Sequence, residues 1–113
     1  MVDAAHGIGV GTDAAWEYAT RFGLPKILVI NGLDKANPRF DAIVEDCREH
    51  FGKNVFPLAL PLNAGPGFSA VLDVMRNEIC TYQPGSSGKY TESPAGALSE
   101  RVQQMHRTLI EYV

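Results

Sequence analysis

The sequence predicts an α/β fold in its first half and a small α+β unit in its second half. Two observations indicate this. In the first half, a helical pattern of apolar residues, an unbroken apolar run and a second helical pattern follow one another. In the second half, short β-prone segments cut by Pro and Gly lead into one more amphipathic pattern. The expected boundary separates residues 1–53 from residues 54–113.

The first expected helix begins at Thr12, whose hydroxyl can cap free backbone N–H groups, with Asp13 complementing the positive helix end. Gly23 suits a left-handed stop after the last turn. The apolar residues at helical spacing, expected to be buried, are Ala15, Trp16, Ala19 and Phe22.

Residues 26–30 form an apolar run that predicts a strand buried on both faces, as in a parallel sheet. A second helix is expected after it, with Asn37 as the cap, Pro38 as the first residue and Gly52 as the stop. The apolar stripe of that helix consists of Phe40, Ile43, Val44, Cys47 and Phe51.

The second half predicts four closely spaced strands, which indicates antiparallel pairing, and a final amphipathic helix. The expected strands are residues 55–60, 68–75, 78–82 and 89–92, with turns at 63–67 and 83–88. The apolar positions of the final helix are Leu98, Val102, Met105, Leu109 and Tyr112.

Composition excludes several classes of protein. The chain has 113 residues, 45% of them hydrophobic and 20% charged, which is an ordinary globular mixture. A net charge of −3 gives no general attraction to DNA or to anionic lipid. No apolar run approaches the about 20 residues of a membrane helix. Cys47 and Cys80 are typical of core residues in a reducing cytosol.

The chemical signal of the chain is the pair Asn31 and Asp34, directly after the apolar run. In open α/β sheets, ligands bind beyond the carboxyl ends of the strands. An ionised Asp34 accepts two parallel N–H bonds, and guanine offers such a donor pair at N1 and N2 whereas adenine does not. Asn and Asp are also common turn residues, so a plain turn is the other interpretation of this spacing.

Other candidate residues point to structure rather than chemistry. His6, His50 and His106 share no metal-ligand spacing, which predicts surface histidines and no metal site. Trp16 and Met105 lie at helical core positions. The pair Ser86 and Ser87 is typical of a hairpin tip, and no catalytic residue is predicted.

Two segments carry a resemblance to a known family. "VDAAHGIGVGTDAAWEYATRFGLPKILVINGLDK" and, after it, "FPLALPLNAGPGFSAVLDVMRNEICTY" resemble an internal part of translation elongation factor G. The resemblance implies part of a P-loop-type GTPase domain at residues 1–53, cut within a longer protein. It implies the start of a small inserted subdomain at residues 54–113.

By this resemblance Asn31 and Asp34 take the first and last places of the guanine-specificity motif Asn-Lys-x-Asp, and Gly32 stands where the family has Lys. Lys35 comes too late in the chain to align with that lysine, so weakened binding of GTP and GDP is implied, and Gly32→Lys is expected to tighten it. The motif G-x-x-x-x-G-K-[ST] is absent from the chain, so Mg²⁺ and phosphate contacts fall to other parts of the parent.

The implied role is guanine recognition in a cytoplasmic, ribosome-dependent translocase, without GTP hydrolysis by this chain alone. The alternative is a divergent GTPase-like module that has lost nucleotide binding and serves protein interaction or structure. The strand at residues 26–30 is expected to lack neighbours, which predicts self-association.

Overall fold

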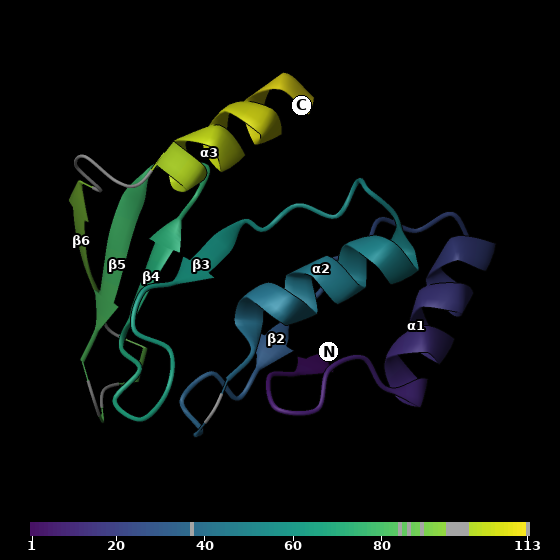
Figure 1. Ribbon diagram of the computed structural model, residues 1–113, viewed down its shortest axis with the longest axis horizontal. Coiled ribbons are helices and arrows are strands. Elements are labelled where there is room, and N and C mark those ends of the chain that lie inside the picture. The colour runs from purple at the N-terminus through teal and green to yellow at the C-terminus, as the bar shows by residue number, and fades with distance from the viewer. Residues whose placement is uncertain (37, 84, 86, 89, 95–99, 113) are drawn as a thin grey trace.

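The computed structural model describes residues 1–36, 38–83, 85, 87–88, 90–94 and 100–112, and within them it is an α/β structure. Figure 1 shows a small parallel sheet with α1 and α2 at one end of the molecule, and an antiparallel sheet with α3 at the other. This arrangement confirms the expected fold class. The elements are β1 (Val2–Asp3), α1 (Val10–Arg21), β2 (Ile30–Asn31), α2 (Phe40–Phe51), β3 (Ala59–Pro61), β4 (Ala70–Asp73), β5 (Glu78–Tyr82), β6 (Tyr90–Pro94) and α3 (Glu100–Tyr112).

Helix α1 begins two residues before its expected cap. Gly9 occupies the cap position, and the Thr12 hydroxyl instead donates to the Met1 carbonyl oxygen at 2.6 Å. Thr12 therefore ties the helix to the start of the chain rather than capping it. The expected stripe is also partly wrong, because Phe22 is 70% exposed and Ala15 is exposed. The expected stop is confirmed at Gly23, which has a φ of 64°.

Strands β1 and β2 pair in parallel, with Val2 opposite Ile30, so the expectation that this strand lacks neighbours is wrong on one side. Its expected bounds of 26–30 are also wrong, because β2 covers only Ile30–Asn31. The expectation of burial on both faces is wrong. Ile27 and Val29 are 81% and 52% exposed. Side chains alternate along an extended segment, so Leu28 and Ile30 reach the core against α2 while their neighbours face the other way.

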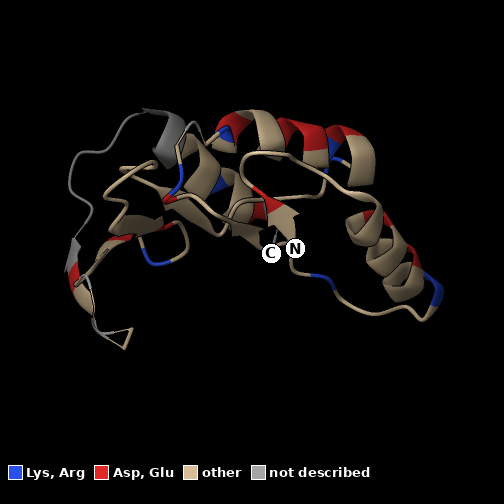
Figure 2. Ribbon diagram, turned by 90° about the horizontal axis from the view of Figure 1, so that it is seen from below, with Lys and Arg blue, Asp and Glu red and all other residues tan. Residues whose placement is uncertain are grey.

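Helix α2 begins at Phe40, after Arg39, so Pro38 lies outside the helix and is not its first residue. The expected cap Asn37 lies outside the described residues. The apolar stripe is confirmed, with its centre buried and its ends half-buried, and Gly52 follows the last turn. Figure 2 shows the acidic residues of α2 grouped along its outer side. One cluster of buried residues joins α2 to the start of the chain and consists of Val2, Ala4, Ile43 and Cys47.

The second sheet has the order β3-β4-β5-β6 with antiparallel pairing throughout, as expected. Strand β5 has the expected bounds, whereas β3 and β4 are shorter than expected and β6 is shifted toward the C-terminus. Pro57 lies inside the first expected strand and cannot donate to a ladder, which accounts for its late start. The expected turn at residues 83–88 lies partly outside the described residues.

Helix α3 lies beside this sheet (Figure 1), with Leu109 buried and Met105 half-buried. Leu98 and the side chains of Val102 and Tyr112 lie outside what the structure describes. On α3, His106 Nδ1 lies 2.5 Å from the Val74 carbonyl oxygen. None of the described helices is both long enough and apolar enough to cross a membrane.

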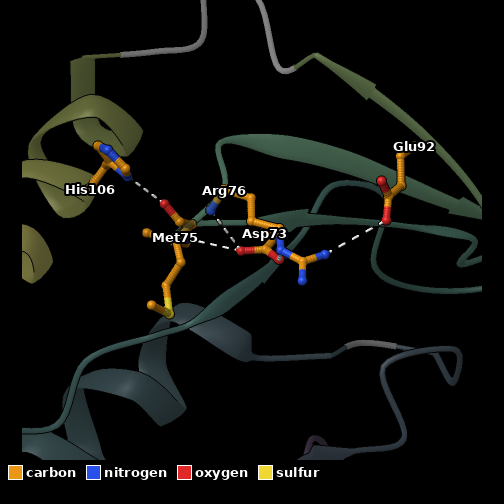
Figure 3. A network of polar contacts seen from close by, with 6 residues as sticks. Asp73, Met75, Arg76, Glu92 and His106 are labelled. Carbon is orange, nitrogen blue, oxygen red and sulfur yellow. Dashed lines mark hydrogen bonds and ion pairs between the residues drawn. The ribbon is translucent and has the colours of Figure 1, made fainter.

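The turn between β4 and β5 is built on one carboxylate. Asp73 Oδ1 accepts hydrogen bonds from the backbone N–H groups of Met75 and Arg76, each at 3.0 Å. The Arg76 guanidinium then lies 3.8 Å from the Glu92 carboxylate on β6 (Figure 3). The same turn therefore connects β6 and α3 to the middle of the sheet.

Candidate functional site

The carboxyl ends of β1 and β2 meet at one edge of the parallel sheet, because Asp3 lies opposite Asn31. The chain segments that follow are joined by backbone hydrogen bonds. The Ala4 N–H donates to the Asn31 carbonyl oxygen at 2.8 Å, and the Arg39 N–H donates to the Ala4 carbonyl oxygen at 3.2 Å. Two strand ends and the start of α2 thus form one surface, where open α/β sheets bind their ligands.

The turn after β2 presents both predicted site residues to solvent. The Lys35 N–H donates to the Gly32 carbonyl oxygen at 3.2 Å, which closes the turn. Leu33 is half-buried against the core and anchors it. Asn31 and Asp34 are exposed, and within the described part of the chain neither side chain has a hydrogen bond or ion pair. Their polar groups are therefore available to a ligand.

Lys35 lies closer to Gly32 than its place in the sequence suggests. A Cβ atom at Gly32 would be 3.7 Å from Lys35 Cδ and 3.8 Å from Lys35 Cε. The turn therefore folds the Lys35 stem back over the open face of Gly32. Gly32 has a φ of 85°, a conformation that glycine adopts without the cost borne by other residues.

Asp3 and His6 also belong to this surface, although the sequence predicted no role for Asp3 and placed His6 in a loop. Asp3 Oδ1 accepts from the Ala5 N–H at 2.8 Å and the His6 N–H at 3.1 Å, and His6 Nδ1 lies 3.1 Å from the same oxygen. The Ala5 N–H first, and the His6 side chain next, lower the pKa of Asp3. The sequence did hold a signal for Asp3, namely its spacing from His6. Both strands end in a polar residue, Asp3 or Asn31, and a second polar residue follows three positions later.

The second sheet touches the same turn. The Gly65 N–H donates to the Leu33 carbonyl oxygen over 2.6 Å. Cavities of about 430 and about 660 Å³ lie between the two sheets. Ile30 and Leu33 line the larger one, but neither cavity is lined by Asn31 or Asp34. The candidate site is thus an open edge rather than an enclosed cavity, suited to holding one face or edge of a planar ligand.

The chain is similar in sequence to bacterial elongation factors G. Elongation factor G of Mycoplasma pneumoniae is 27% identical over 114 residues, which cover 100% of this chain and 17% of that protein. Elongation factor G 2 of Syntrophus aciditrophicus is 30% identical over 97 residues, covering 83% of this chain and 14% of that protein. The chain therefore spans less than a fifth of the length of these relatives.

A crystal structure of a Thermus thermophilus protein has the same fold. It superposes with a TM-score of 0.81 at 32% sequence identity, over 97% of this chain and 16% of that chain. No family model matches the chain.

Proposed function

We infer that this elongation-factor-G-like segment, derived from a translational GTPase, contributes the edge that reads the guanine base of GTP and GDP. One observation carries the inference. Asn31 and Asp34 are both exposed, on either side of the anchored Leu33, at the carboxyl end of a parallel strand. Residues 1–53 would supply this edge, and residues 54–113 would be the start of an inserted subdomain.

The chemistry favours guanine over adenine. The Asp34 carboxylate accepts the N1–H and N2–H donors of guanine in two charge-assisted hydrogen bonds. Against adenine the same carboxylate would lose its solvent without gaining these donors. Sites that rely on such bonds reject the wrong partner by as much as about 10⁴-fold. The Asn31 amide both donates and accepts, so it can bond the base and brace the turn.

Lys35 is placed to compensate in part for the lysine that the family carries at the position of Gly32. Its stem lies over Gly32 and its side chain is exposed, so its ammonium is available to a nucleotide. Phosphate and Mg²⁺ contacts would come from the rest of the longer protein, since this chain has no G-x-x-x-x-G-K-[ST]. In that parent, in the cytoplasm, the segment would serve ribosome-dependent translocation.

Titration of the ¹⁵N-labelled chain with GDP, ADP and xanthosine diphosphate tests this function. The backbone amides of residues 31–35 should shift with GDP and not with ADP. Xanthine carries a carbonyl where guanine carries its amino group, so the amide introduced by Asp34→Asn should turn the preference toward xanthosine diphosphate. Asp46→Asn, the same change at an exposed position of α2, should leave the GDP preference unaltered.

A chain that responds equally to GDP and ADP, or an Asp34→Asn variant that keeps its guanine preference, would count against base recognition. The interaction module would then be the better account. The specific observation that favours it is Gly32, which removes the lysine and adds backbone freedom that ligand binding must restrict.

A further inference from the structure

The loop between β3 and β4 of the second sheet holds residues 31–35, the proposed base-reading turn, through one backbone hydrogen bond. The Gly65 N–H donates to the Leu33 carbonyl oxygen at 2.6 Å, and Leu33 lies between Asn31 and Asp34. In Figure 1 the loop between β3 and β4 lies beside the turn after β2, at the lower edge of the molecule. The two segments are about thirty positions apart in the chain, so neither sequence pattern reveals this contact.

The conformation of Gly65 makes the contact sensitive to substitution. Gly65 is buried and has a φ of 112°, which side chains rarely adopt. A Cβ atom at this position would meet nothing within 4 Å, so space is not the constraint. Backbone strain alone would displace the N–H group after a substitution here.

The Asn63 side chain shapes the loop that carries Gly65. Asn63 Nδ2 donates to the Gly67 carbonyl oxygen and to Ser69 Oγ, both at 3.1 Å. Asn63 Oδ1 accepts from the Ser69 N–H at 3.2 Å and from the Ala70 N–H at 3.0 Å. Both donors and both lone pairs of the amide are thus used within the loop. No other side chain of similar size supplies this combination at the same positions.

We propose that Asn63 is a positioning residue for the base-reading turn. It fixes the loop so that the Gly65 N–H holds the Leu33 carbonyl, and Leu33 in turn fixes the spacing of Asn31 and Asp34. The role rests on the proposed guanine recognition. A movement of the second sheet relative to the first would change the affinity for guanine nucleotides through this contact, without any residue of that sheet touching the base.

The test uses Asn63→Ala and Gly65→Ala, with Asn54→Ala as the matched control, because Asn54 is exposed and makes no hydrogen bond within the described residues. Both test variants should lose hydrogen-exchange protection at the Gly65 amide. Their GDP affinity should fall about three- to tenfold, as expected for one or two hydrogen bonds. The ratio of GDP to ADP affinity should fall with it, which a general loss of stability would not produce in samples that remain folded.

The outcomes separate the two proposals. An unaltered chain without guanine preference rejects the proposed function, and the positioning role falls with it. An unaltered chain with a guanine preference that both test variants retain overturns the positioning role alone. If Asn54→Ala loses the guanine preference to the same extent as Asn63→Ala, the positioning role is also overturned, because the effect would then not depend on the loop.

Discussion

The indole ring of Trp16 stacks on the phenyl ring of Phe51, with centroids 4.2 Å apart and an interplanar angle of 26°. Lys26 Nζ lies 4.7 Å from the centre of the Trp16 ring, and His50 bonds to Asp13 beside the stack. Helix α1 therefore meets α2 through an aromatic contact near the surface, in place of the broad buried stripe that its sequence predicts.

Phe51→Ala should destabilise the fold by about 2 kcal/mol. The expected loss is below the range for a fully buried Phe, because Phe51 is half-buried, but it includes the stacking contribution. Urea unfolding followed by the fluorescence of Trp16, the single Trp of the chain, measures it. Phe22→Ala at a 70% exposed position should cost less than about 0.5 kcal/mol. Equal losses for the two variants would show that the stack contributes little.

Asp3→Asn should remove a pH-dependent part of the stability. The Ala5 N–H and then the His6 side chain lower the pKa of Asp3 in the folded chain. A carboxylate whose pKa is lower in the folded chain than in the unfolded chain stabilises the fold at pH values above its unfolded pKa. This stability is lost as the pH falls through the folded pKa. The urea midpoint of the unaltered chain should exceed that of Asp3→Asn near about pH 6, and the difference should shrink toward about pH 3. A difference that does not change with pH would contradict this.

Cys47 should resist thiol reagents in the folded chain. It is 2% exposed, and burial first and Asp46 second raise the pKa of its thiol. Burial first and Glu92 second also raise the pKa of the Cys80 thiol, so exposure decides the order. Cys80 is half-buried and should be labelled first at mildly alkaline pH, with Cys47 following only on unfolding. Mass spectrometry of single Cys→Ser variants separates the two sites. Labelling of Cys47 at the rate of Cys80 would show that the α2 core opens without global unfolding.

The chain should self-associate through the exposed side of the segment before β2. Ile27 and Val29 are 81% and 52% exposed, and within the described residues β2 pairs with β1 alone. Light scattering should give a dimer or a larger species that Val29→Lys converts to a monomer. Val10→Lys, at an 88% exposed position of α1, is the control and should change nothing. A monomeric unaltered chain at high concentration would refute this prediction.

Gly32→Lys should bind GDP more tightly than Gly32→Ala. Both substitutions place a side chain at a φ of 85°, which costs about 1–2 kcal/mol of stability, so their difference isolates the effect of the lysine. The added ammonium should favour the nucleotide despite this strain. Isothermal titration of the two variants measures the difference. Identical affinities would indicate that Lys35 already supplies what the side chain at this position could offer.

The sequence by itself determined the elements whose signals are local. Apolar residues at helical spacing identified α2 through Ile43, Val44 and Cys47, and the β-prone run at residues 78–82 matched β5. The order of helix, strand and helix predicted a parallel pairing. These features could be predicted because the buried face of a helix or strand sets the spacing of its apolar residues, about 3.6 positions in a helix and about two in a strand. Asn31 and Asp34 were predicted as site residues from their place after an apolar run, and the structure places both, exposed, at the carboxyl end of β2.

Tertiary structure decided what depends on groups far apart in the chain. The Thr12 hydroxyl donates to the Met1 carbonyl oxygen and therefore does not cap α1. Val29 faces outward because the structure covers only one face of its segment. Gly65 reaches Leu33 because two turns from different sheets meet. Hydrogen bonds and burial of this kind arise when distant segments pack together, so no local pattern encodes them.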